Sequence, residues 1–275
     1  MAINLASKYA SKVDERFKLK ELTGYGLNTD YNWEGVATVS IYNIDTVPLN
    51  DYTKSGANRY GTPEELGDTK KDYTLTTDKA FTFTIDEFYK KSQQGAKQAG
   101  KALAREIDEV IVPFKDKQRL GVWSATATET AQVITGTPTK TNAYSLFLDM
   151  QEILDNRLVP SQGRIFYTTP AFYKAIKQDD TFIKASDIAQ KMLINGQVGE
   201  IDGVKIVKCP ASYFAEGDVG MLVYPRSTIS PSKLKDYKIH NDPVGIDGDL
   251  VEGRIMMDTF VLEAKKNGIV ALRTA

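Results

Sequence analysis

The sequence, 275 residues long, predicts an α+β fold organised around one long and polar helix. A short alternating strand, residues 81–85, runs directly into a helical pattern that continues to Pro113. A hairpin pattern with a long polar loop precedes this strand, and short strands and amphipathic helices follow the helix. Because the apolar stripe on the helix is thin, we expect an elongated, flat subunit and not the compact core of an enzyme.

Local signals predict where the long helix begins and ends. Thr84 and Glu87 have the spacing of a capping box. Pro113 has no N–H to donate, so the regular helix should end or kink near Val112. Residues 86–112 would then form a rod of roughly 40 Å at 1.5 Å per residue. Two apolar series recur at seven-residue spacing along this rod: Ala96, Leu103 and Val110, and Gly100, Ile107 and Phe114.

Two segments before this strand are expected to lie outside the core. Residues 1–27 carry too few apolar side chains to build a core, so they predict an arm that orders against a partner, detached from the rest by residues 24–26. Residues 36–44 and 73–85 predict two strands of a projecting hairpin. The stretch between them, residues 50–71, is long and polar, and loops of this kind are usually functional or disordered.

The second half predicts a mixture of helices and short strands. Thr169 should cap a helix that begins at Pro170, and Asp202-Gly203 should turn a hairpin. The other expected elements are helices at 141–159 and 187–193, strands at 165–167 and 219–224, and two strands within 250–273 around a turn at 265–268.

Composition restricts the function. Acids and bases nearly cancel, giving a formal net charge of −1, and no segment concentrates Lys and Arg as nucleic-acid-binding faces do. Cys209 is the only cysteine, which excludes an internal disulfide and a multi-cysteine metal site, and its neighbours predict an inert buried thiol. No run approaches the roughly 18 apolar residues of a membrane span. The N-terminus also lacks the apolar run of a signal peptide, so we expect folding in a cytoplasm.

Nothing in the sequence predicts a catalytic, metal or cofactor site. His240 is the only histidine, and nothing near it has the spacing of a metal ligand or nucleophile, so we expect it to have a structural hydrogen-bonding role. No nucleophile elbow, phosphate loop or dinucleotide fingerprint occurs. We therefore predict that the protein is not an enzyme and needs no cofactor.

Several short runs of the sequence carry a resemblance when they are taken together and in order. They are 31–36, 199–204 with Cys209 and Pro210, 235–243, Gly245, Gly248, 250–254, 258–262 and 266–269. This ordered set resembles the major capsid protein of tailed bacteriophages, which has the Hong Kong 97-type capsid fold. The run at 31–36 is similar to the start of the extended arm of this family, and 199–204 with Cys209 and Pro210 is similar to the hairpin of its axial domain.

The resemblance implies four parts. These are an N-terminal arm at 1–27, an extended loop at 28–84, a peripheral domain with the spine helix at 85–125 and 245–275, and an axial domain at 126–244. It also implies pentamers and hexamers that tile an icosahedral shell around phage double-stranded DNA, without sequence-specific DNA binding or a membrane. Portal and decoration proteins would join the shell, and its place would be the virion, after assembly in the host cytoplasm. Because no long cleaved scaffolding segment precedes residue 2, we expect a separate scaffolding protein.

Charged side chains on the loop, the spine helix and the C-terminal turn are the expected intersubunit contacts. In the loop, opposed charges suit complementary contact with a neighbouring subunit. Gly100 is costly inside a helix unless another backbone comes close to it. The predicted contact residues are Lys54, Arg59, Glu64, Glu65, Asp68, Lys70 and Lys71 of the loop, Lys97, Lys101 and Arg105 of the helix, and Lys265 and Lys266 of the turn.

Two other classes of function stay open. Encapsulin nanocompartments share this fold and roughly this length but hold cargo enzymes, and residues 1–27 do not resemble their cargo-binding region. A soluble monomeric enzyme or binding protein is the alternative from a different class. The molar mass of the purified protein would separate the monomer from both shells, and the contents of the particle would separate the two shells.

Overall fold

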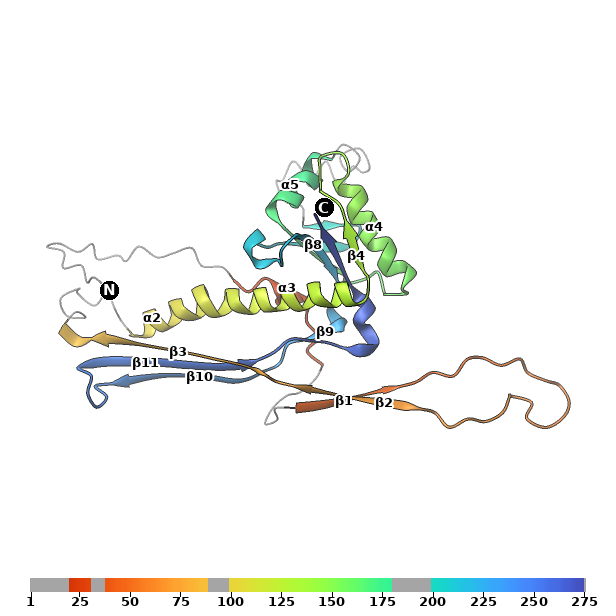
Figure 1. Ribbon diagram of the computed structural model, residues 1–275, viewed down its shortest axis with the longest axis horizontal. Helices are drawn as coiled ribbons and strands as arrows, with labels where there is room; N and C mark the ends of the chain where they lie inside the picture. The colour runs from red at the N-terminus through yellow and green to blue at the C-terminus, as the bar shows by residue number, and fades with distance from the viewer. Residues whose placement is uncertain (1–19, 31–37, 89–98, 180–198, 275) are drawn as a thin grey trace.

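The computed structural model describes residues 20–30, 38–88, 99–179 and 199–274. Within these ranges the molecule is elongated, with a two-stranded ribbon projecting from one end (Figure 1). A three-stranded sheet runs alongside the long helix toward the other end, and a six-stranded sheet with two further helices lies across the helix. None of the described helices has the length and apolarity that a bilayer span requires.

The long helix continues past its predicted end. Helix α2 (Ala99–Glu106) passes through a π-helical turn, η2 (Ile107–Ile111), into helix α3 (Val112–Glu129). The backbone N–H of Val112 donates to a carbonyl five residues back, so this turn is wider than an α-helical one. Pro113 then lies in the first turn of α3, where its missing N–H costs little. The helix therefore does not end near Val112, but its regular α-helical geometry is interrupted there by the π turn, which accommodates the proline.

The π turn also moves the apolar stripe. Ile111 is 5% exposed and packs on the sheet, whereas Val110, which the seven-residue series placed in the stripe, is 50% exposed. Leu103 and Ile107 pack on the sheet as predicted. At Gly100, an added Cβ would meet no atom of the described residues outside the helix backbone within 4 Å, so the expected close backbone is not among these residues. Ala96, also in the predicted stripe, lies outside the described residues.

The three-stranded sheet has the order β10-β11-β3 and is antiparallel throughout. Its strands are β3 (Thr77–Asp86), β10 (Ser232–Asn241) and β11 (Gly248–Met257). Alternate residues of β3 and β11 face the helix and form its small apolar clusters, which include Phe81, Phe83, Ile85, Val251, Ile255 and Met257. The thin stripe of the helix thus meets one face of a narrow sheet.

The predicted capping box is wrong. Thr84 lies inside β3, paired with Leu250 of β11, so it cannot cap a helix. The chain instead leaves the strand at Asp86, whose Oδ1 accepts the N–H of Phe88 at 3.0 Å, and Glu87 N–H donates to Asp247 O at 3.0 Å. Burial of one face of the strand prevails over the local helix signal.

The projecting hairpin is confirmed, with one change. Strand β1 (Thr38–Ile44) pairs antiparallel with β2 (Asp68–Thr74), and Val39 and Ile41 share its less exposed face. The predicted strand at 73–85 is two strands, because β2 ends before β3 begins and the two pair with different partners. Thr76 marks the break, where its N–H and hydroxyl donate to Asp258 at 3.2 and 2.7 Å.

The six-stranded sheet is mixed and has the order β4-β13-β8-β5-β7-β6. Its strands are β4 (Val133–Thr135), β13 (Ile269–Arg273), β8 (Asp218–Val223), β5 (Ile165–Thr168), β7 (Val204–Lys208) and β6 (Glu200–Ile201). The other described elements are α4 (Ala143–Asn156), α5 (Pro170–Gln178), β9 (Thr228–Ile229), β12 (Phe260–Val261), η1 (Thr23–Gly26), η3 (Ala211–Tyr213), η4 (Pro225–Ser227) and η5 (Glu263–Gly268).

Both faces of this sheet are buried. Phe166 of β5 points to α4 and α5, where its ring lies 5.1 Å from that of Phe147. Tyr167, the next residue, points to α3, where its ring lies 5.0 Å from that of Trp123. Covered on both faces, the sheet strands carry nearly continuous apolar runs.

Strong local signals in the second half are confirmed. Thr169 Oγ1 accepts the N–H of Phe172 at the start of α5. Asp202 and Gly203 have φ of 48° and 75°, as the predicted tight turn requires. The helix predicted at 141–159 is α4, and the strands predicted at 165–167 and 219–224 are β5 and β8. The helix predicted at 187–193 lies outside the described residues.

The two strands and the turn predicted at the C-terminus are present as β11, β13 and η5, with the short strand β12 between β11 and the turn. Within 250–273 the strands β11 and β13 belong to different sheets, and the turn between them is the 3₁₀ segment η5. Sheet membership also divides the chain differently from the resemblance. Residues 269–273 join the six-stranded sheet, and residues 232–241 join the three-stranded one.

Candidate assembly interface

The arm, defined here as β1, β2 and residues 45–67 between them, exposes many apolar side chains. The loop has some local order, because Thr53 N–H donates to Arg59 O at 3.0 Å and the rings of Tyr52 and Tyr60 lie 5.0 Å apart. The exposed apolar residues are Tyr42, Ile44, Val47, Leu49, Tyr52, Tyr60 and Leu66. A concentration of exposed apolar groups on one projection is typical of an interaction surface.

The base of the arm is packed against the body. Tyr73 and Leu75 are buried together with Ile229 and Leu262. The ring of Tyr73 lies 5.4 Å from that of Phe260, and its hydroxyl oxygen accepts the N–H of Glu263 at 3.1 Å. The arm is therefore fixed at its base and projects freely beyond β2 in this subunit (Figure 1).

The predicted contact residues of the loop are exposed. Arg59 Nε donates to Gly56 O at 3.2 Å, and Lys70 Nζ lies 3.4 Å from Asp72 within the same strand. The remaining predicted residues of the outer arm, all exposed, are Lys54, Glu64, Glu65 and Asp68. Their placement leaves these charges available to a second copy.

Three of the predicted lysines lie together at the base of the arm. Lys71 and Lys266 both pair with Glu263, and Lys266 Nζ lies 2.6 Å from Glu129 at the end of α3. Lys265 lines a hollow of about 370 Å³ between the arm and η5. Lys71 and Lys266 thus act within the subunit, a role that the sequence did not indicate.

The predicted charges of the spine helix are separate from the arm. Lys101 is exposed on α2, and Arg105 Nε lies 3.2 Å from Glu109 Oε1 one turn further on. Lys97 lies outside the described residues.

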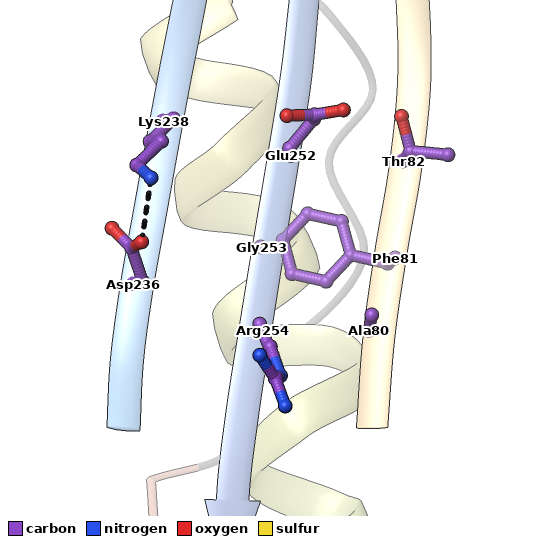
Figure 2. Close-up of a pocket in the computed structure, with 8 residues that line it drawn as sticks. All are labelled: Ala80, Phe81, Thr82, Asp236, Lys238, Glu252, Gly253 and Arg254. Carbon is purple, nitrogen blue, oxygen red and sulfur yellow. Dashed lines mark ion pairs between the residues drawn. The ribbon is translucent and has the colours of Figure 1, made fainter. Parts of the chain in front are cut away.

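Acidic and basic side chains alternate on the outer face of the three-stranded sheet, where they line a shallow hollow (Figure 2). Arg254 Nη2 lies 2.5 Å from Asp78 Oδ2, and Lys238 Nζ lies 2.8 Å from Asp236 Oδ2. The hydrogen bond and charge of Arg254 lower the pKa of Asp78. The sequence does not indicate this pair, because its two residues lie 176 positions apart.

His240 lies near the end of β10 on this outer face. Its Nε2 is 3.4 Å from Glu252 Oε2, and both side chains are about half exposed. In the described residues, no three His, Cys, Asp or Glu side chains gather as a metal site.

Glycine at 253 allows an aromatic ring to cross the strand. An added Cβ would lie 2.2 Å from Cε1 of Phe81 and 2.9 Å from Cδ1 of Tyr237. Figure 2 shows the Phe81 ring extending from β3 to Gly253 of β11. The contact joins the strands on the side of the sheet that faces the helix.

Residues 21–26 are docked on α3, contrary to the prediction that 24–26 detach the N-terminal arm. Asp116 accepts the N–H of Leu22 at 3.1 Å, the N–H of Thr23 at 3.0 Å and the hydroxyl of Thr23 at 2.6 Å. Arg119 pairs with Glu21 and donates to Thr23 Oγ1 at 3.0 Å. Residues 21–26, the first described segment of the chain to make these contacts, are thereby fixed to the body.

Cys209 is buried as predicted. Burial, with a smaller contribution from the charge of Asp116, raises the pKa of the Cys209 thiol to about 12. Since the thiolate is the reactive form, this thiol is suited to packing and not to chemistry.

Comparison by sequence finds no matching family model and no matching curated protein. Comparison of structures finds a chain from Mycobacterium phage Che8 with a TM-score of 0.78 and 17% identity, covering 98% of both chains. The capsid of cyanophage P-SCSP1u matches with a TM-score of 0.75 and 14% identity, covering 98% of this chain and 93% of that one. The mature capsid of bacteriophage PhiM1 matches with a TM-score of 0.72 and 10% identity, covering 98% of this chain and 92% of that one. The chain therefore has the Hong Kong 97-type fold of tailed-bacteriophage capsid proteins.

Proposed function

We propose that this protein is the major capsid protein of a tailed bacteriophage and acts as a structural shell subunit without catalysis. The observation that carries the proposal is the likeness to capsid structures over 98% of the chain. The projecting arm supports it, because exposed apolar groups on such a projection suit burial by another subunit.

The subunits would form pentamers and hexamers through head-to-tail contacts that close into rings, and the rings would enclose double-stranded DNA. A separate scaffolding protein, a portal and decoration proteins would be the further partners. The place of the protein would be the virion, after assembly in the host cytoplasm. Contact with DNA would be non-specific, since the formal net charge is −1.

The arm would act as the clasp between subunits. Its outer charges, including Lys54, Glu64 and Glu65, are exposed, and complementary charges fix the register of a contact more than they add affinity. We assign the four parts as an N-terminal arm at 1–27, an extended loop at 28–84 that includes the projecting arm, a peripheral domain at 85–125 with 245–275, and an axial domain at 126–244. By sheet membership, 232–241 would move to the peripheral part and 269–273 to the axial part.

The proposal is tested by the mass and shape of the purified protein. Concentrated protein should show capsomer rings or closed shells in electron micrographs, and light scattering should give a multimeric mass. Protein that stays monomeric at every concentration, with and without phage scaffolding protein, would contradict the proposal. Shells purified with enzyme cargo instead of DNA would point to an encapsulin.

A further inference from the structure

The described contacts between the arm and the body gather at the base of the arm. Thr76, between β2 and β3, is held by two hydrogen bonds to Asp258. Tyr73 and Leu75 are buried beside it in a small apolar cluster. Ile41 of β1 also packs on this cluster, and the Tyr73 hydroxyl accepts the N–H of Glu263 at 3.1 Å. These contacts hold the arm at its base, but apolar packing is non-directional, so it leaves the angle of the arm open to a further restraint.

A chain of four charges also joins the base of the arm to the body. Glu263 of η5 pairs through Oε2 with Lys71 of β2 and through Oε1 with Lys266, at 2.7 Å. Lys266 also lies 2.6 Å from Glu129, the last residue of α3. The chain therefore connects the arm to the C-terminal end of the spine helix, where the helix dipole favours a cation such as Lys266.

The position of Lys71 lets this chain of charges restrain the angle at which the arm leaves the body. Lys71 is five residues before Thr76, roughly 16 Å along an extended strand at about 3.3 Å per residue. Beyond Lys71 the ribbon and its loop project well past the body (Figure 1). A small displacement at Lys71 would therefore move the tip of the arm several times further.

We propose that Glu263 is the positioning residue of the arm: by joining Lys71 to Lys266, it sets the angle at which the arm leaves the body. This inference rests on the proposed shell function, in which the angle of the arm determines where the arm contacts a second subunit. The side chains of Lys71 and Glu263 are about half exposed, so the pair adds little to folding stability. A restraint of this kind can open and close as subunits assemble while the fold stays intact.

The experiment measures the angle in the isolated subunit. Spin labels are placed at Ser55→Cys on the loop and Gln162→Cys on the body, both exposed positions, and Cys209 stays unlabelled because it is buried. Distances are then recorded in dilute, monomeric protein. The parent should give a narrow distance peak, and Glu263→Gln, which keeps the shape but removes the charge, should lose it. Lys71→Gln should have the same effect.

Asp72→Asn is the matched control. Asp72 is an acid on β2, the strand of Lys71, and its partners Lys70 and Ser40 both lie within the arm, so the control should keep the narrow peak. An unchanged peak in both Glu263→Gln and Lys71→Gln would overturn the inference, as would an equal loss in Asp72→Asn. These readings do not require shells, so they are independent of the proposed function. In the assembly assay, Glu263→Gln should yield fewer closed shells than the parent, and an undiminished yield would also overturn the inference.

Discussion

Asp116 holds Thr23 by two hydrogen bonds across 93 residues of sequence, at 3.0 Å to its N–H and 2.6 Å to its hydroxyl. Both residues are almost completely buried. The contact connects the spine helix to the segment at residues 21–26. In the proposed shell, it would fix this segment on the body of the subunit.

Replacing Asp116 with Ala should destabilise the subunit. The change removes the acceptor of the buried N–H and hydroxyl of Thr23 and of the partly buried N–H of Leu22, which costs about 2–3 kcal/mol. Urea unfolding followed by circular dichroism measures the loss. Asp149→Ala on the exposed face of α4 is the control and should leave the midpoint nearly unchanged. Equal midpoints for the two variants would mean that the buried contact is unimportant.

Aspartate at two helix positions seven residues apart should have opposite outcomes. Leu103→Asp places a carboxylate against the sheet and should cost about 2–3 kcal/mol or prevent soluble expression. Val110→Asp should be tolerated by the isolated subunit, since the π turn leaves Val110 half exposed. Expression and thermal melting compare the two. A stable Leu103→Asp subunit would show that the packed face is assigned wrongly.

Replacing each of two glycines with alanine should have opposite effects on the stability of the subunit. Gly253→Ala should destabilise the subunit, because the new Cβ would overlap the Phe81 ring. Gly100→Ala should stabilise the isolated subunit by about 0.5–1 kcal/mol, since the helix gains propensity and an added Cβ meets no described neighbour. Melting temperatures test both. If Gly100→Ala nevertheless prevents assembly, the close backbone expected at Gly100 comes from another subunit.

Cys209 should resist thiol reagents in the native protein. Its folded pKa of about 12 lies above the usual value of about 8.5, so little thiolate forms in the folded state at pH 8.5. The raised pKa contributes stability that is complete below about pH 8.5 and is lost as pH rises toward 12. Labelling should be slow in buffer and fast in urea, and rapid labelling of native protein at pH 8 would contradict the burial.

Sequence reasoning was most accurate where a signal and its structure lie within a few residues. The Thr169 cap and the Asp202-Gly203 turn were predicted correctly, because each needs only neighbouring backbone groups. The capping box predicted at Thr84 does not form, because pairing with β11 stabilises continuation of the strand through this residue. The fold itself was predicted from an ordered set of short runs and not from any single element.

The contacts of the candidate interface were harder to predict because their partners are distant in sequence. Lys71 meets Glu263 across 192 residues, and Arg254 meets Asp78 across 176. The π turn was also not predicted, because no residue pattern in the sequence marks a wider helical turn here. Its effect is seen only in the structure, where Ile111 and not Val110 faces the sheet. Charge type in the sequence indicated where contacts could form, but not whether they form within or between subunits.

The most direct test of the account replaces residues 53–67 of the arm with a short Gly-Ser turn and measures both folding and assembly. The removed residues are exposed and make few described contacts with the body, so the melting temperature and helix content of the isolated subunit should stay nearly unchanged. Electron micrographs should show no closed shells, whereas a Gly-Ser replacement of the exposed residues 161–162 should still give them. Intact shells without residues 53–67, or an unfolded subunit, would contradict the claim that the arm is the clasp between subunits.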